Sequence, residues 1–314
     1  MIGYVFRRLL SLIVSCFLIS VLVFVVMRVI PGDPAQIMLG TEADPATLSA
    51  LRAQLGLDRP IYVQYGAWVH GILTGHLGQS LRYHVPISGL IAARLAVTVP
   101  LAILAMLIAV VIGLPAGIYA AIHRGGPGDY GVIALSQAGL SIPSFWLGIL
   151  LMLAFSLKLR WLPTGGFVPW SESFGGAIQS LLLPAAALGV IRAAVVARLG
   201  RSSFLEVMGR DYIRTARGKG VREVVVVWKH ALRNSLIPIV TVLGMQFASL
   251  LAGAIIIENV FYLPGLGRLA FQAIGQRDLP VVQDIVVLVA ILVVSMNLIV
   301  DLAYALLDPR IRLE

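Results

Sequence analysis

The side chains best suited to chemistry lie in a basic segment between two apolar stretches. From Arg198 to Arg233 the sequence holds nine Lys or Arg residues and only three acidic residues. Cationic groups at this density bind either the acidic surface of a partner protein or the anionic headgroups of phospholipids. Composition alone leaves both readings open.

Familiar catalytic and metal-binding patterns are missing from the sequence. Lys219 lies between two glycines, as in a phosphate-binding loop, but Ile213 stands where the first glycine of that loop belongs and Gly220 replaces the magnesium-binding Ser or Thr. His70, His76 and His84 are spaced by six and eight residues, which does not place all three on one helical face. Neither an HExxH nor a GxSxG motif occurs. We therefore expect no enzyme activity, no metal site and no cofactor in this chain.

Long apolar stretches dominate the rest of the sequence. Hydrophobic residues make up 59% of the 314 positions and charged residues 12%, whereas soluble domains have about 25% charged residues. Six stretches reach the roughly 20 residues that a helix needs to cross a bilayer. They are 9–30, 100–122, 132–157, 178–197, 236–257 and 285–307. We predict an all-α membrane protein with six transmembrane helices.

The distribution of Lys and Arg predicts how these helices are oriented. With the N-terminus inside, the internal segments hold 14 cations in 61 residues and the external segments hold 8 in 116, so both termini are expected to be cytoplasmic. The net charge of +9 reflects this sorting and gives no reason to expect nucleic-acid binding. The predicted organisation is a first transmembrane helix (1–30), an extracytoplasmic segment (31–99), a five-helix core (100–307) with a cytoplasmic loop (198–235), and a cytoplasmic tail (308–314).

Several shorter signals refine this picture. Asp44 before Pro45 predicts a helix start, followed by a second apolar helical stripe that contains Tyr65 and Trp68. These two helices could pack on the bundle or form a platform for an external partner, and their spacing does not decide between the two. Gly113 and Gly117 have the spacing that lets two helices approach closely.

Ionisable residues are not expected at mid-membrane depth, where ion-coupled carriers place them. Glu258 and Asp284 flank apolar stretches at their external ends, and Asp301 lies near the cytoplasmic end of the last one. Arg192 is close enough to the cytoplasmic end of its stretch to snorkel. A transporter without an ion site of its own needs a driving force from a partner, and the basic segment is the surface that could receive it.

The segment RTARGKG, residues 214–220, resembles the EAA-type motif of ABC importer permeases, in which a small residue and a glycine lie four positions apart, here Ala216 and Gly220. The usual leading Glu is replaced by Arg214, and the usual Leu-Pro pair is Ile237-Pro238, farther downstream. Both departures are typical of the peptide-transport branch. Four further segments match that branch: 55–80, 140–151, 258–269 and 307–312. Along nearly its whole length the chain resembles the first of two permease subunits of a dipeptide/oligopeptide ABC importer.

This resemblance implies a type I ABC importer permease fold in the bacterial inner membrane. It also implies a second homologous permease subunit, two ABC ATPase subunits that hydrolyse ATP, and an extracytoplasmic peptide-binding protein. The implied ATPase-coupling helix includes small residues that fit a groove of the ATPase and cations that pair with its acidic rim. Its residues are Asp211, Arg214, Thr215, Ala216, Arg217, Lys219, Gly220 and Arg222.

The resemblance further implies that the turn formed by Pro264, Gly265 and Gly267 helps to shape the outer mouth, and this sequence suits a type II bend. The solute stays open among dipeptides, oligopeptides, glutathione and metal chelates. A stand-alone secondary carrier or channel is the alternative function, and a membrane scaffold without transport would explain the apolar stretches but not the resemblance.

Overall fold

The computed structural model describes residues 2–29, 33–39 and 44–307, so the predicted tail 308–314 lies outside the described residues. The described part is built from helices and contains no strand. The helices are α1 (Ile2–Val29), α2 (Pro34–Leu39), α3 (Pro45–Gln54), α4 (Ile61–Thr74), α5 (Ile87–Ile122), α6 (Pro127–Ser141), α7 (Ser144–Leu151) with its π-helical continuation η1 (Met152–Lys158), α8 (Phe174–Met208), α9 (Asp211–Gly218), α10 (Glu223–Val225) with η2 (Val226–Ala231), α11 (Leu232–Val260), α12 (Leu266–Gly275) and α13 (Leu279–Leu307).

Five of these helices, α1, α5, α8, α11 and α13, are long and apolar enough to cross a membrane. The stretch expected to be the third span is not one straight helix. It is divided into α6 and the continuous helix formed by α7 and η1, and the axes of these two helices differ by 101°. Ile142 and Pro143 between them have extended backbones, because proline disfavours helical geometry in the residue before it and cannot donate a helix hydrogen bond. The all-helical membrane fold is confirmed, and six spans result if this bent pair counts as one.

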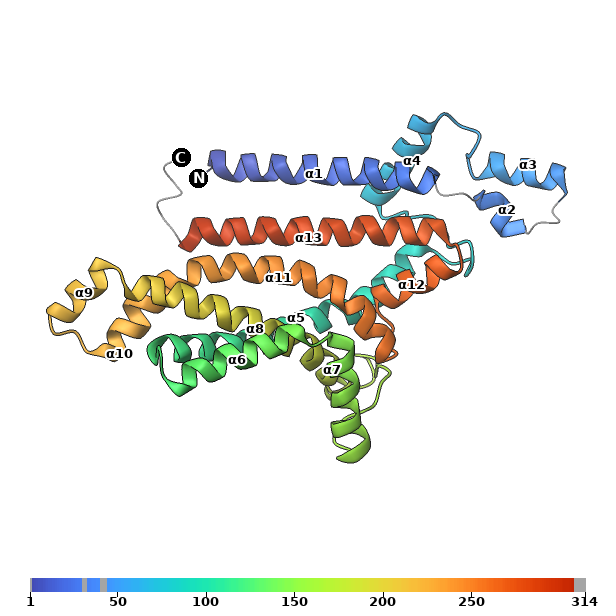
Figure 1. The fold of residues 1–314 in the computed structure, drawn as a ribbon. Coiled ribbons are helices and arrows are strands. Elements are labelled where there is room, and N and C mark those ends of the chain that lie inside the picture. The colour runs from blue at the N-terminus through green and yellow to red at the C-terminus, as the bar shows by residue number, and fades with distance from the viewer. Residues whose placement is uncertain (1, 30–32, 40–43, 308–314) are drawn as a thin grey trace.

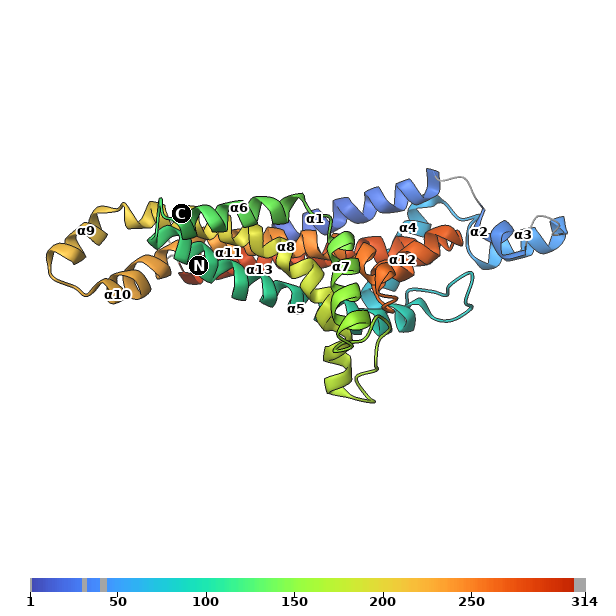
Figure 2. The ribbon, with the colours of Figure 1, turned by 60° about the horizontal axis from the view of Figure 1, so that its bottom comes forward.

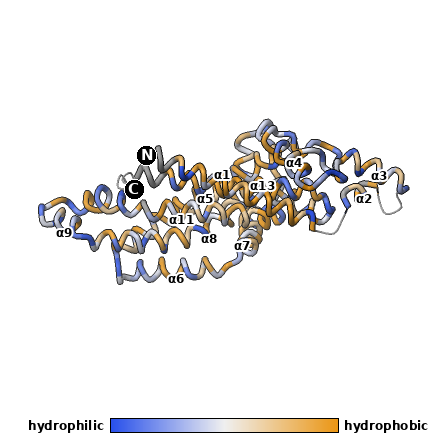
Figure 3. The backbone as a smooth tube through the Cα atoms, turned by 90° about the horizontal axis from the view of Figure 1, so that it is seen from above, coloured by the Kyte–Doolittle hydropathy of each residue, from blue (hydrophilic) through white to orange (hydrophobic). Residues whose placement is uncertain are grey.

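The long helices lie side by side along one axis (Figure 1). One end of the bundle holds α9, α10, the start of α1 and the end of α13, and the other end holds α2, α3, α4 and α12 (Figures 1 and 2). Arg8 of α1 and Asp301 of α13 form an ion pair of 3.0 Å near the first end. The hydropathy view shows apolar residues along the long helices and hydrophilic colours concentrated toward the two ends (Figure 3). This arrangement agrees with two termini on the same, cytoplasmic side.

The centre of the bundle is the packing of α5 against α8, which share the most extensive contact. Gly113 and Gly117 of α5 face α8, and a Cβ atom on Gly113 would lie 2.5 Å from the Ala193 carbonyl oxygen. A Cβ on Gly117 would collide with the Ala197 carbonyl oxygen in the same way. The predicted close approach of two helices is therefore confirmed as a packing feature.

The extracytoplasmic helices form where the sequence predicted them. Asp44 caps α3 by accepting a hydrogen bond from the Thr47 amide at 3.3 Å. Tyr65 and Trp68 of α4 pack on Phe24 of α1, with ring centroids 5.3 Å and 5.7 Å from the Phe24 ring. The packing interpretation therefore holds for α4, whereas α3 buries no residue. Because α5 already begins at Ile87, the expected boundary at residue 99 lies inside that helix.

Candidate functional site

The predicted coupling segment forms a compact helical hairpin at the cytoplasmic end. The chain leaves the bundle through α8, forms the short helix α9, and returns through α10 and η2 into α11 (Figure 1). Arg210 precedes α9, and Asp211 is its first residue, where a carboxylate interacts favourably with the helix dipole. The segment is therefore a defined element with both of its ends attached to long bundle helices.

One face of α9 is fixed to the bundle by apolar packing. Ile213 is completely buried among Phe204 of α8 and Val226 and Ala231 of η2. Ala216, one turn after Ile213, packs against the same cluster. Burial of a large aliphatic side chain contributes about 1.5–3 kcal/mol. A displacement of α9 must therefore carry the adjoining turns of α8 and η2 with it.

The spacing of Ala216 and Gly220 has a backbone explanation. The Val221 amide donates to the Ala216 carbonyl at 3.2 Å, and the Gly220 amide donates to the Arg217 carbonyl at 2.9 Å. These two bonds are the Schellman motif that ends many helices, and it requires a left-handed residue just after the helix. Gly220 supplies that conformation with φ of +76° and has open space around it, while Ala216 and Val221 both pack against the apolar cluster that contains Ile213. The side chain of Ala216 packs against its own chain. A fit into a partner's groove is therefore not needed to explain why a small residue stands here.

The cations of the motif differ in what they contact. Arg217 donates from Nε to Glu223 Oε2 at 3.0 Å and from Nη2 to Oε1 at 2.5 Å, which ties α9 to α10. This paired guanidinium lowers the pKa of the Glu223 carboxyl below its ordinary value. Arg214 lies 3.6 Å from Asp211 in a solvent-exposed ion pair, a type that contributes little to stability. Lys219 and Arg222 are exposed, and neither forms an ion pair with any residue that the structure describes.

Thr215 was expected in this site from the sequence, whereas Tyr212, Asn234, Val224 and Trp228 were not. Thr215 bonds back to the Asp211 carbonyl at 2.9 Å, and Tyr212 Oη accepts a hydrogen bond from Asn234 of α11 at 3.0 Å. Val224 and Trp228 are 67% and 61% exposed, and their spacing of four places them on one side of the helical stretch next to the basic residues. An exposed valine and tryptophan four residues apart within a basic segment are a signal that could have identified this apolar surface.

The predicted outer-mouth turn lies at the opposite end of the bundle. Glu258 lies in the last turn of α11, at the end of its apolar stretch as expected, and is completely buried. Its carboxylate accepts hydrogen bonds from Thr98 Oγ1 at 2.6 Å and from the Arg268 amide at 3.1 Å. Thr98 in turn accepts from the Leu266 amide at 2.8 Å. This network joins α5, α11 and the first turn of α12.

The glycines of this turn are required for close contact. A Cβ on Gly265 would collide with the Glu258 carboxylate, and one on Gly267 would collide with the backbone of Ile255. Pro264 precedes Gly265, which caps α12 in an extended conformation with φ of −103° and ψ of 178°. The expectation of a type II bend was therefore wrong, because that bend needs a positive φ at its third residue. Gly265 has a negative φ because it caps the start of α12 and is not part of an isolated turn.

A second expectation about charged residues also needs correction. Arg192 lies near the middle of α8, which extends to Met208, and therefore does not snorkel to the cytoplasmic surface. Its guanidinium donates to Gln246 Oε1 at 3.1 Å and to the Ser249 carbonyl at 3.3 Å, both on α11. Arg192 therefore links two long helices inside the bundle.

Comparison with known proteins gives consistent matches along the chain. Residues 113–313 match the family model "Binding-protein-dependent transport system inner membrane component", and residues 1–102 match the model of the N-terminal part of such membrane components. The chain is 43% identical over 314 residues to a putative peptide transport system permease protein of Brucella abortus, covering all of both proteins. It is 44% identical over 312 residues to the glutathione transport system permease protein GsiC of Escherichia coli K12, covering 99% of each.

A solved structure supports the same fold. A chain of the inward-facing MetNI methionine ABC transporter aligns with a TM-score of 0.59 at 21% identity, covering 70% of this chain and 96% of that chain. At this identity the likeness shows the fold, and it agrees with the predicted type I importer permease architecture.

Proposed function

The chain belongs to the family of inner membrane components of binding-protein-dependent transport systems, and we propose that it forms half of the translocation pathway of a peptide importer. It is a permease of the peptide and glutathione type of ABC importer. A second homologous permease subunit supplies the other half of the pathway, and two ABC ATPase subunits hydrolyse the ATP. An extracytoplasmic peptide-binding protein delivers the solute to the outer face of this multi-pass subunit of the bacterial inner membrane.

The proposed coupling role of α9 rests mainly on the contacts that its buried face makes with the bundle. Ile213 is buried between the end of α8 and η2, and Tyr212 is hydrogen-bonded to Asn234 of α11. An ATPase that moves α9 therefore moves two long helices of the bundle together. A contact that favours one position of α9 thus biases the equilibrium between two arrangements of the bundle, which is the physical meaning of coupling.

The surface offered to an ATPase is mixed in character. Lys219 and Arg222 are exposed, and their charges form no ion pair with the residues that the structure describes. Tyr212, Val224 and Trp228 provide exposed apolar area beside them. Large aromatic side chains with neighbouring cations are typical of residues that dominate binding at protein interfaces. The proposed contact therefore combines an aromatic anchor at Trp228 with charged residues that orient the partner.

The outer turn has a proposed role at the other end of the pathway. Pro264, Gly265 and Gly267 place the start of α12 against Glu258 and Thr98. Because these contacts are buried and hydrogen-bonded, α12 keeps a fixed position relative to α5 and α11. We expect this turn to form part of the outer mouth of the pathway.

The experiment that tests this function is purification of the tagged chain from its native membrane in mild detergent, followed by mass spectrometry. A second permease and ABC ATPase subunits in near-stoichiometric amounts are the expected result. Reconstitution of that complex with its binding protein should give ATP-dependent uptake of labelled dipeptides or glutathione. A homo-oligomer that transports solute without any ATPase would instead identify a stand-alone carrier or channel and would remove the coupling role of α9.

A further inference from the structure

Arg192 places a positive charge inside the membrane-spanning part of the bundle. It lies near the middle of α8, and its guanidinium contacts Gln246 and Ser249 of α11. These two residues lie near the centre of the apolar span Pro238–Val260, which is 23 residues long. An ionised side chain at this depth is costly in contact with lipid, so such residues face a protein interior or a water-filled pathway.

The charge of Arg192 is not neutralised by the described part of the chain. Its guanidinium donates to Gln246 Oε1 at 3.1 Å and to the Ser249 carbonyl at 3.3 Å, and both acceptors are uncharged. It forms no ion pair with any residue that the structure describes. A guanidinium has five N–H donors in one plane, so these two bonds leave three donors for another acceptor. The neutral contacts therefore orient the guanidinium and leave its charge for an anion.

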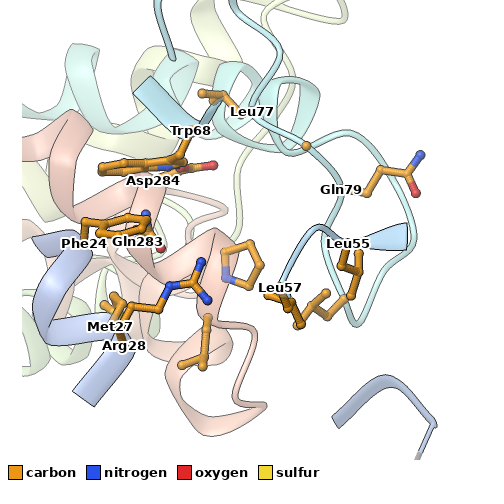
Figure 4. A pocket seen from close by; sticks show the side chains of 14 residues that line it. Phe24, Met27, Arg28, Leu55, Leu57, Trp68, Leu77, Gln79, Gln283 and Asp284 are labelled. Carbon is orange, nitrogen blue, oxygen red and sulfur yellow. The ribbon is translucent and has the colours of Figure 1, made fainter. Parts of the chain in front are cut away.

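The acids at the extracytoplasmic end are enclosed by their own chain. Glu258 is completely buried and Asp284 is 4% exposed. Asp284 accepts a hydrogen bond from Trp68 Nε1 at 2.8 Å and lies against the Trp68 ring, beside a cavity of about 250 Å³ (Figure 4). Arg192 is different because it is only partly buried. Its Nε has no hydrogen-bond partner among the described residues and is not one of their buried unpaired atoms, so another molecule can reach it.

A partly open stripe leads from Arg192 toward the cytoplasmic end of α8. Val195 and Leu199, three and seven residues after Arg192, are partly buried as Arg192 is. Arg198 and Ser202, three and seven residues after Val195, are exposed. Residues at these spacings lie on one side of a helix. The side of α8 that carries Arg192 therefore opens toward the cytoplasm and has a second cation there.

The neighbouring side of α11 is open as well. Ser249 is four residues after Met245 and seven before Ile256, so the three residues lie on one side of the helix. Met245 and Ile256 are 64% and 50% exposed. This chain therefore leaves uncovered the surface beside Arg192 where α8 meets α11. Because lipid tails do not accept the charge of Arg192, this surface suits the pathway between two permease subunits.

We propose that Arg192 is a solute-binding residue of the translocation pathway and that its ligand is a carboxylate of the transported peptide. This assignment rests on the proposed function as half of a peptide importer. A guanidinium and a carboxylate match in charge and in the spacing of two parallel hydrogen bonds. Every unmodified peptide ends in a carboxylate, so one arginine serves peptides of different sequence. Arg198 offers the next positive charge on the way to the cytoplasm.

The test compares dialanine with its C-terminal amide in proteoliposomes that contain the whole complex. The two peptides differ in the carboxylate, and uptake is measured with the binding protein saturated, so that its own preference does not enter. We expect Arg192→Gln to lower the uptake of dialanine about tenfold or more, the scale of one hydrogen bond between charged groups, and to leave the uptake of the amide nearly unchanged. An equal loss for both peptides would overturn the proposal, because a helix contact or an ion pair with the second permease would affect both alike.

Two further variants serve as controls. Arg192→Lys should retain more dialanine uptake than Arg192→Gln, because the charge remains although the paired donors are lost. Val190→Ala is the matched control, since Val190 is 39% exposed on another side of α8, and it should change the uptake of neither peptide. Copurified ATPase reports assembly of every variant. If the unchanged complex lacks an ATPase, the proposed function itself fails; if it imports dialanine and Arg192→Gln does so equally well, only the role of Arg192 fails.

Cysteine labelling tests the position of Arg192 even if the binding protein does not accept the amide. Cys16 is the only cysteine of the chain, so Cys16→Ser combined with Arg192→Cys leaves one thiol, at position 192. We expect 2-aminoethyl methanethiosulfonate, which adds a positive charge, to restore dialanine uptake to this variant. The 2-sulfonatoethyl reagent adds a negative charge and should react without restoring uptake. A thiol at position 192 that reacts with neither reagent during ATP turnover, or uptake restored equally by both, would contradict the proposal.

Discussion

Gly220 offers a direct way to learn what the proposed coupling motif requires. Its backbone is in the left-handed region with φ of +76°, and no atom lies within 4 Å of the position that a Cβ would occupy. A side chain here therefore causes backbone strain but no collision within the chain. The left-handed conformation costs most residues roughly 1–2 kcal/mol relative to glycine, whereas asparagine adopts it more readily.

Two explanations of this glycine predict opposite orders of activity. If the Schellman motif must hold the end of α9, Gly220→Ala should impair coupling more than Gly220→Asn does. Strain of about 1–2 kcal/mol lowers the ratio of closed to frayed helix ends about 5–30-fold. If instead a partner's groove requires a small residue, Gly220→Ala should be tolerated and the larger Gly220→Asn should fail. Gly220→Val combines strain with bulk and should uncouple ATP hydrolysis from uptake under both explanations.

The assay is ATP hydrolysis and peptide uptake measured on the same proteoliposomes containing the complex and its binding protein. The ratio of solute imported to ATP hydrolysed reports coupling, and copurified ATPase reports assembly. Gly218→Ala is the matched control, because Gly218 is the last residue of α9, has helical geometry and also has open space around it. Alanine should be neutral or slightly stabilising there. Normal uptake per ATP in Gly220→Val would refute the role of this turn in coupling.

Three further predictions concern the underside of α9, its exposed face and the outer turn. Ile213→Ala should lower the packing free energy of α9 by about 2–5 kcal/mol and reduce uptake per ATP in proteoliposomes while the subunit remains inserted. Unchanged uptake per ATP would show that the buried contacts of Ile213 are not needed for coupling. Trp228→Ala should reduce copurification of the ATPase by at least about tenfold, the loss expected for an interface anchor, whereas Trp228→Phe should retain most of it. If both variants copurify as much ATPase as the unchanged chain does, Trp228 is not part of the interface. Gly265→Ala should lower the thermal unfolding temperature of the complex because its Cβ collides with Glu258, whereas Gly275→Ala has open space at the far end of α12 and should not; equal melting temperatures would contradict the described packing.

The sequence predicted the number and location of the apolar stretches because hydropathy and length set them directly. It did not predict the bend of the third stretch, although Pro143 marks its position, since proline is also found in membrane helices that remain straight enough to span. Asp44 and Pro45 predicted the start of α3 correctly because a helix cap is a local interaction. Features set by a few neighbouring residues were therefore predictable.

Features that depend on distant contacts were not predictable in the same way. The ion pair of Arg217 with Glu223, across the turn that Gly220 makes, was not predicted. Glu258 lies at the end of its helix as expected, but its partners Thr98 and the start of α12, both distant in sequence, were not predicted. Arg192 was misplaced because α8 continues past the apolar stretch that defined the prediction. In each case the partner of a polar side chain is chosen by how the helices pack.

The packing also suggests how the two ends of the bundle communicate. The helical stretch that starts at α10 continues through η2 and α11 without a break to Val260. Its first turns enclose Ile213 of the proposed coupling helix α9, and its last turn carries Glu258, which holds the start of α12. Helices transmit displacement along their axis because their backbone hydrogen bonds resist stretching. A movement of α9 is therefore expected to reach the outer turn through this one stretch, with η2 and Pro238 as the places where it can bend.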